Sequence, residues 1–384
     1  MKKRFTAMLM AAVMTVTMAA CGGKEPAQGG GDAERTFYIG SSGPLTGDNA
    51  IYGQAVINGA QLAVDEINAA GGSIRFTFLQ QDDEADGEKA VNAYNTMMDQ
   101  GMQILVGPTT TGASLAVAEK CAADRTFMLT PSASSPDVTE GKDNVFQVCF
   151  TDPNQGVASA DYMAEKMPEA KIAVIYRNDD PYSQGIRDAF VAEAAEKGLN
   201  IVYQGTFTDE TKTDFTVQLT SAQTKGADLV FLPIYYQPAS VIFNQARAMG
   251  YAPTFFGVDG MDGILTMPGF NAELAEGVML LTPFSVTVAE NKPFVDAYTA
   301  AYKVEPNQFA ADAYDAVYIV KQALEAAGCT ADMSASEICE KLVETMPEIT
   351  FTGLTGKGMT WNAEGEVSKE PSAYTIKDGV YVAG

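Results

Sequence analysis

Residues 36–79 read TFYIGSSGPLTGDNAIYGQAVINGAQLAVDEINAAGGSIRFTFL and contain one complete unit of the fold. The apolar run 36–40 predicts a strand, and a Gly/Ser-rich turn follows it. After the turn, apolar residues recur at helical spacing until the Gly71-Gly72 pair, which ends the helix. Residues 74–79 predict the next strand. The stretch is therefore typical of a strand–helix–strand unit in a parallel sheet.

The same alternation of apolar runs and helical patterns continues in two series. The central strands are apolar throughout, as expected where both faces of a sheet are buried. Such runs occur at 104–106, 127–129, 172–176, 201–203 and 229–232. The alternation predicts an α/β fold built on doubly wound parallel sheets. Strand-like runs at 145–150 and 277–282 are candidate crossovers between two lobes, and the tail from 351 to 382 again has β character.

Composition excludes several classes of function. The 384 residues are 46% hydrophobic, which is enough for the cores of more than one domain. There is no His, so the commonest catalytic base and metal ligand is missing. The net charge of −24 repels nucleic acid phosphates, and we expect no nucleic-acid partner. No phosphate-binding loop of the Gly-x-Gly-x-x-Gly type follows a strand, and we expect no cofactor.

The first residues predict export. Three basic residues precede an apolar stretch that is too short to span a bilayer of ~30 Å, so residues 1–20 are interpreted as a signal peptide. The stretch ends in MAACG at 18–22, which resembles the bacterial lipobox, and Cys21 is then the lipidated residue. An ordinary signal peptide with an incidental Cys21 is the alternative. The Gly-rich residues 21–35 predict a flexible tether.

Four further cysteines lie in the body of the chain, at 121, 149, 329 and 339. They form no Cys-x-x-Cys pair, so the sequence gives no zinc or redox motif. In an exported protein Cys329 and Cys339 could form a disulfide bridge, and buried free thiols are the alternative.

An ordered set of motifs covers nearly all of the chain beyond residue 40. The motifs are GPLTG at 43–47, NGA at 58–60, DEINAAGG at 65–72, DD at 82–83, VGPTTT at 106–111, TPSASSP at 130–136, YSQG at 182–185 and FTGLTG at 351–356. Each falls at a predicted junction between elements. The set resembles the leucine/isoleucine/valine-binding protein family, whose members are type I periplasmic binding proteins of ABC importers.

The resemblance implies two doubly wound parallel-sheet lobes joined by three crossover strands, with a ligand enclosed between them by hinge closure. The first lobe would comprise 36–151 and 282–350. The second lobe would comprise 152–281 and 351–384.

Hydroxyl groups of the predicted first lobe are candidates for binding a carboxylate. Thr110 and Thr111 lie between an apolar strand and a helix, where free N–H groups and the helix dipole favour an anion. Helix capping is the alternative role for these threonines. The resemblance places a ligand-carboxylate hydroxyl at Thr111, backbone groups at Ser132, and a hydroxyl and N–H at Ser134. A solvated Ser/Pro-rich turn is the alternative for the two serines.

Residues of the predicted second lobe are candidates for the rest of the ligand. Asp259 follows an apolar strand, at the position where the family carries an acid for an ammonium group. A plain Asp-Gly turn is the alternative. Tyr182 and Tyr235 match aromatic residues that close over the ligand, although Tyr236 could exchange roles with Tyr235. Tyr52 of the first lobe occupies a position where well-known members carry Trp.

These residues predict an extracytoplasmic lipoprotein that captures an α-amino acid, branched-chain or otherwise aliphatic, and delivers it to an ABC importer permease. We expect a monomer attached to the membrane through its lipid. A short amide, a carboxylate or an aromatic acid is an alternative ligand, and a ligand-sensing module is an alternative role. An enzyme would need an acid–base pair, and the only candidates are the carboxylates at 82–84. No nucleophile or metal ligand accompanies them in the sequence.

Overall fold

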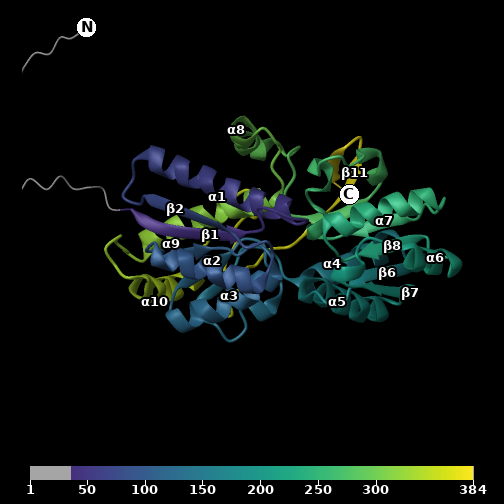
Figure 1. Ribbon diagram of the computed structural model, residues 1–384, viewed down its shortest axis with the longest axis horizontal. Coiled ribbons are helices and arrows are strands. Elements are labelled where there is room, and N and C mark those ends of the chain that lie inside the picture. Colours follow the sequence, from purple (N-terminus) through teal and green to yellow (C-terminus); the bar gives the residue numbers. More distant parts are fainter. Residues whose placement is uncertain (1–35, 384) are drawn as a thin grey trace, which may run out of the picture. The chain divides into compact units, whose positions relative to one another are not determined.

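The computed structural model describes residues 36–383. The predicted signal peptide, Cys21 and the tether lie outside the described residues. Within them, the chain forms two α/β lobes, each built around one sheet (Figure 1). The sheet of the first lobe has the order β2-β1-β3-β4-β5 and is parallel throughout. Its strands are β1 (Phe37–Gly43), β2 (Phe76–Asp82), β3 (Ile104–Val106), β4 (Phe127–Thr130) and β5 (Val145–Gln147).

The sheet of the second lobe has the order β12-β11-β10-β9-β8-β6-β7. Its strands are β6 (Lys171–Arg177), β7 (Asn200–Phe207), β8 (Leu229–Leu232), β9 (Thr254–Gly257), β10 (Met279–Thr282), β11 (Ser372–Lys377) and β12 (Val380–Ala383). The strands from β7 to β10 are parallel, whereas β11 and β12 form an antiparallel hairpin at the edge. The predicted doubly wound parallel fold is confirmed, with this hairpin as an antiparallel addition.

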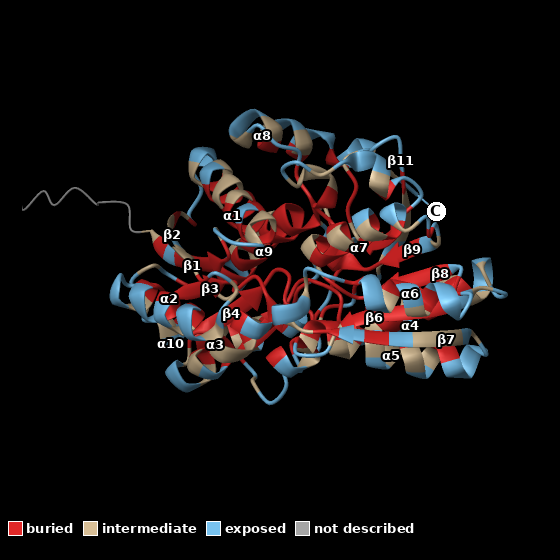
Figure 2. Ribbon diagram, turned by 45° about the vertical axis from the view of Figure 1, so that its right-hand side comes forward, coloured by how far each residue is buried: buried red, intermediate tan, exposed pale blue. Residues whose placement is uncertain are grey.

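Helices cover the sheets of both lobes. The first lobe contains α1 (Ala50–Ala70), α2 (Gly87–Asp99), α3 (Thr111–Asp124), α8 (Lys292–Tyr302), α9 (Gln308–Ala326) and α10 (Ala335–Thr345). The second lobe contains α4 (Asp152–Lys166), α5 (Pro181–Lys197), α6 (Thr216–Thr224) and α7 (Tyr236–Ala248). The sheets are buried between these layers, and the outer faces of the helices are exposed (Figure 2).

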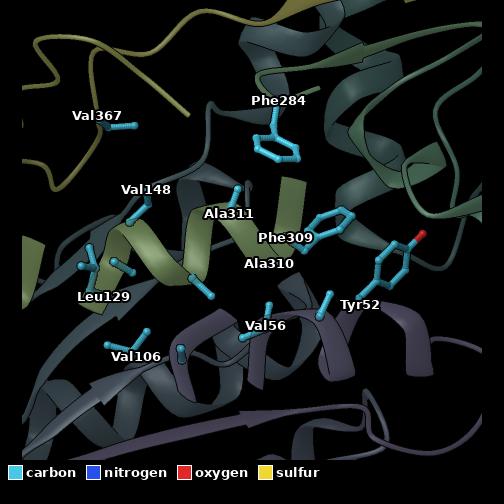
Figure 3. Close-up of a cluster of buried hydrophobic side chains, with 14 of the residues drawn as sticks. Tyr52, Val56, Val106, Leu129, Val148, Phe284, Phe309, Ala310, Ala311 and Val367 are labelled. Atoms are coloured by element: carbon cyan, nitrogen blue, oxygen red, sulfur yellow. The ribbon is translucent and has the colours of Figure 1, made fainter. Parts of the chain in front are cut away.

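Close packing of α1 against α9 forms much of the core of the first lobe (Figure 3). A Cβ atom at Gly59 would lie 2.1 Å from the carbonyl oxygen of Ala310, so only glycine allows this approach of the two helices. The rings of Tyr52 and Phe309 meet edge to face with centroids 4.8 Å apart. Since Tyr52 and Phe309 also reach the space between the lobes, this packing fixes one wall of the site described below.

Three connections join the lobes, at 148–151, 283–291 and 346–371. A buried ion pair between Lys369 and Asp312 of α9 lies where the first and third of these connections meet. Lys369 Nζ also donates to Thr355 Oγ1 over 2.8 Å and to the carbonyl oxygen of Val148 over 3.2 Å. Removing one partner of such a pair leaves a buried charge uncompensated, so this network links these two connections to α9.

Two sequence predictions differ from the structure. The runs at 145–150 and 277–282, predicted as crossovers, contain β5 and β10, which are paired strands of the two sheets, and the chain crosses only after each of them. They look like crossovers in sequence because both lie next to one. The Cys329–Cys339 bridge is absent, and the four described cysteines are buried free thiols. Burial raises the pKa of the Cys121 thiol, and the nearby Cys339 adds to this rise.

Candidate functional site

A cavity of about 270 Å³ lies between the lobes, beyond the carboxyl ends of β3, β4, β6, β8 and β9. Open parallel sheets place their ligands at this edge. Its lining residues come from both lobes and are Tyr52, Thr109, Thr110, Thr111, Ser132, Tyr182, Tyr235, Asp259, Gly260 and Phe309. The structure thus brings together all the predicted ligand residues except Ser134, which is fully buried and does not line the cavity.

Residues 107–110, which we call the threonine loop, connect β3 to α3. This loop contains a buried hydroxyl group without a hydrogen-bond partner among the described residues. Thr110 is the N-cap residue of α3, but its side chain makes no capping hydrogen bond. Its Oγ1 is buried and has no partner among the described residues. A buried hydroxyl without a partner is costly, so helix capping does not explain Thr110. Thr111 begins the helix and is 2% exposed. The arrangement suits an anion at the helix N-terminus.

Residues 131–135, which we call the serine loop, follow β4 and form a hydrogen bond with the threonine loop. Ser132 Oγ donates to the carbonyl oxygen of Thr109 over 2.5 Å, so its hydroxyl positions the neighbouring loop. Ser134 accepts a backbone hydrogen bond from Asp152 at 2.9 Å, while its own Oγ lacks a partner within residues 36–383. The two serines therefore differ: Ser132 reaches the cavity, and Ser134 supports the loop from behind the lining.

Asp259 lies just after β9, in the short helical turn Asp259–Met261, and is 3% exposed. Its Oδ1 accepts from Tyr182 Oη over 2.5 Å, and its N–H donates to Gln155 Oε1 over 3.1 Å. Burial raises the pKa of the Asp259 carboxyl to about 7, although the hydrogen bonds from Tyr182 and Gln155 oppose the rise. No cation faces this carboxylate in the cavity lining, so an ammonium group would supply the missing charge.

Aromatic rings form the remaining wall. Tyr182 and Tyr235 stack with centroids 4.9 Å apart and 12° between the planes. The hydroxyl of Tyr52 donates to the carbonyl oxygen of Gly260, and Tyr182 Oη accepts from the N–H of Gly260 over 2.9 Å. A Cβ at Gly260 would lie 2.5 Å from Tyr182 Oη, which explains glycine there. Because both hydroxyls are occupied, these tyrosines offer mainly ring surface to a ligand.

Tyr235 and Tyr236 have different roles. Tyr235 lines the cavity. The hydroxyl of Tyr236 instead donates to the carbonyl oxygen of Asp48 over 2.6 Å, and its N–H donates to Tyr52 Oη over 3.0 Å. Tyr236 therefore connects the two lobes and leaves the lining to its neighbour.

Sequence reasoning missed the lining residues Gly260 and Phe309 and the buried Asp152. Phe309 lines the cavity from the first turn of α9, where an aromatic residue in an apolar helix looks like core packing. Asp152 begins α4, is fully buried, and has no hydrogen-bond partner for either carboxylate oxygen within the described chain. Burial raises the pKa of Asp152 strongly, and the nearby Asp259 adds to this. In the sequence, Asp152 could have been noticed as a carboxylate at the start of a helix directly after a crossover. An acid in the first turn of a helix is common, however, because it interacts favourably with the helix dipole.

The carboxylates at 82–84 serve the structure. Asp82 accepts from the N–H of Leu45 over 2.9 Å and from Thr46 Oγ1 over 2.7 Å, and Asp83 accepts from Ser42 Oγ over 3.0 Å. They hold the loop that leads into α1 and do not line the cavity. Between residues 36 and 383 no group of three or more Cys, Asp or Glu side chains could hold a metal ion. The described helices include none that is long and apolar enough to span a bilayer.

Two α/β lobes that line one cavity from both sides are the architecture of a periplasmic binding protein. The family model described as periplasmic binding protein matches residues 36–379, and the chain belongs to this family. The family consists of solute-binding proteins, which are not enzymes. The resemblance seen in the sequence is therefore confirmed.

Curated relatives and solved structures agree. The chain is 30% identical over 337 residues to a Leu/Ile/Val-binding protein homologue of Brucella melitensis, covering 86% of this chain and 88% of the relative. It is similar to the LivJ substrate-binding protein of a Streptococcus pneumoniae branched-chain amino acid transporter, solved with isoleucine, at 33% identity and a TM-score of 0.81. That match covers 91% of this chain and 98% of LivJ. The leucine-binding protein LivK of Thermotoga maritima gives 26% identity and a TM-score of 0.81, with 91% and 98% coverage.

Proposed function

We propose that this protein captures a branched-chain or other aliphatic α-amino acid outside the cytoplasm and delivers it to the permease of an ABC importer. One observation carries the proposal. A buried carboxylate of the second lobe, Asp259, and the hydroxyls of Thr110 and Thr111 in the first lobe line one cavity of about 270 Å³. An amino-acid zwitterion carries charges complementary to these two groups. The relatives named above, whose names refer to leucine, isoleucine and valine, support this ligand class.

The two ends of the zwitterion are assigned by chemistry. The ligand carboxylate would accept hydrogen bonds from Thr110, Thr111 and the free N–H groups at the start of α3. The ligand ammonium would donate to Asp259, a charge-assisted bond worth ~1.5–3 kcal/mol. Asp152 lies near Asp259 but does not line the cavity, and burial favours its neutral form. Ser132 would contribute backbone groups.

The side chain of the ligand would lie against aromatic rings. Tyr52, Tyr182, Tyr235 and Phe309 contribute these surfaces, and no lining residue carries a positive charge. An acidic side chain would find no partner, whereas a compact apolar side chain would bury its surface at ~25 cal/mol per Å².

The proposal includes the features that the sequence alone predicts. Cys21 would carry the lipid that attaches a monomer to the outer face of the membrane, with residues 21–35 as its tether. The division into 36–151 with 282–350 and 152–281 with 351–384 stays part of this proposal. The boundary between 350 and 351 falls inside the third connection, 346–371. There the N–H groups of Leu354 and Thr355 donate to Asp315 of the first lobe, so this part of the connection is attached to the first lobe.

A ligand screen with a matched variant tests the proposal. We expect leucine, isoleucine or valine to raise the melting temperature, and Asp259→Asn to weaken binding by about tenfold or more because the ammonium loses its charged partner. Calorimetry gives the affinities, and circular dichroism checks that the variant folds. Unchanged affinity would remove Asp259 from the site. Binding of short amides or aromatic acids in place of amino acids would refute the assigned ligand class.

A further inference from the structure

A chain of alternating charges crosses between the lobes outside the amino-acid cavity. Lys212, in the loop between β7 and α6, places its Nζ 2.8 Å from Asp48 Oδ2 of the first lobe. The same Nζ lies 2.9 Å from Asp209 Oδ1, and Asp209 lies 3.1 Å from the guanidinium of Arg177. Within the second lobe, Lys212 is therefore held in position to reach Asp48.

This contact is unusual among the ion pairs of the molecule. Of those formed between residues 36 and 383, Asp48–Lys212 alone joins the two lobes away from the connections at 148–151, 283–291 and 346–371. The backbone beside it is joined as well, since Tyr236 Oη donates to the carbonyl oxygen of Asp48 over 2.6 Å. Both contacts must break when the lobes separate.

A second cavity, of about 340 Å³, lies beneath the contact. Asp48, Lys212 and Arg177 line it, and so does Tyr235, which also lines the amino-acid cavity. Tyr235 is thus a shared wall between the two spaces. An opening at Asp48–Lys212 would expose the second cavity first and Tyr235 next, which places the ion pair on the exit side of the ligand.

We propose that Asp48 and Lys212 form a latch that holds the lobes closed and slows the release of the bound amino acid. The inference rests on the function proposed above. Neither residue lines the amino-acid cavity, so both act as positioning residues through the closed arrangement of the lobes. Because the pair forms only when the lobes meet, its loss raises the dissociation rate and leaves the ligand's own contacts intact.

The expected change in the dissociation rate depends on how far the Asp48 and Lys212 side chains are exposed to solvent. The side chain of Lys212 is 22% exposed and that of Asp48 is 52% exposed, so solvent and salt screen the pair. Pairs of this kind change an equilibrium by about two- to fivefold. We expect Lys212→Met to speed dissociation by about two- to fivefold at low ionic strength, and by less at high ionic strength.

Stopped-flow dissociation of bound isoleucine from four proteins tests the latch. Wild type is compared with Lys212→Met, Asp48→Asn and the double variant. We expect each single variant to release ligand faster, the association rate to stay unchanged, and the double variant to be no faster than the singles, because all three lack the same contact. Lys212→Arg should restore slow release.

Lys197→Met is the matched control, since Lys197 pairs with Asp161 at 2.6 Å and with Glu193 at 3.2 Å inside the second lobe only. It should release ligand like wild type. Equal dissociation rates for wild type and Lys212→Met, or additive effects in the double variant, would overturn the latch.

Small-angle scattering of the ligand-free proteins separates this proposal from the function on which it rests. Lys212→Met should have a larger radius of gyration than wild type at low ionic strength, whether or not an amino acid binds. If wild type binds no amino acid, the proposed function fails and the scattering still decides on the latch. Equal radii would refute the latch even where isoleucine binds.

Discussion

Asp259 shows how burial prepares one side chain for a charged ligand. Its carboxyl is 3% exposed, and burial raises its pKa to about 7. Tyr182 and Gln155 already bond to this residue, so an incoming ammonium finds an oriented acceptor. The cost of charging the carboxylate is then offset only when a cation arrives.

The affinity for an amino acid should therefore depend on pH. An ammonium binds the ionised Asp259, whose proton must leave first, so affinity falls as the pH drops through the pKa of about 7. Going from one unit above that value to one unit below it should weaken binding by about tenfold. Calorimetry in buffers of different ionisation enthalpy should detect the released proton. A flat profile in wild type, or an equally steep one in Asp259→Asn, would contradict this role.

Helix α1 shows how one element serves both the core and the site. Its glycine at position 59 lets it approach α9, and about two turns toward its start Tyr52 reaches the cavity. The position of the aromatic wall therefore depends on helix packing several residues away.

Substituting this glycine should destabilise the first lobe. Alanine is the better helix former by ~1 kcal/mol, but a Cβ at position 59 would lie 2.1 Å from the backbone of Ala310. We expect Gly59→Ala to lower the free energy of unfolding by about 1–3 kcal/mol in urea. Gly72→Ala is the control, because a Cβ there meets no atom within 4 Å. A Gly59→Ala protein as stable as wild type would show that the helices can separate without cost.

At the scale of the whole molecule, much of the fold is visible in the sequence. Strands buried on both faces read as continuous apolar runs, which is why β6 and β8 are predicted almost to the residue. Helix α4 lacks a clear apolar stripe in sequence and is not anticipated. The run at 277–282 is assigned to a crossover because pairing with β9 and β11 depends on distant residues.

The site is predictable to a similar extent and for related reasons. Threonine, serine and acid side chains directly after apolar strands stand out, because strand ends of parallel sheets meet at one edge. Phe309 and Asp152 stand in helices, where an apolar ring and a first-turn acid each have an ordinary explanation. The latch is invisible in sequence, since Asp48 and Lys212 lie in polar loops that only the fold brings together.

We propose that an amino-acid zwitterion spans the two lobes, with its ends held by different halves of the molecule. A crystal structure of the protein with isoleucine tests this most directly. We expect the ammonium nitrogen within hydrogen-bond distance of the Asp259 carboxylate and the ligand carboxylate at Thr110 and Thr111. Isoleucine bound outside this cavity, or bound with its two ends exchanged, would contradict it.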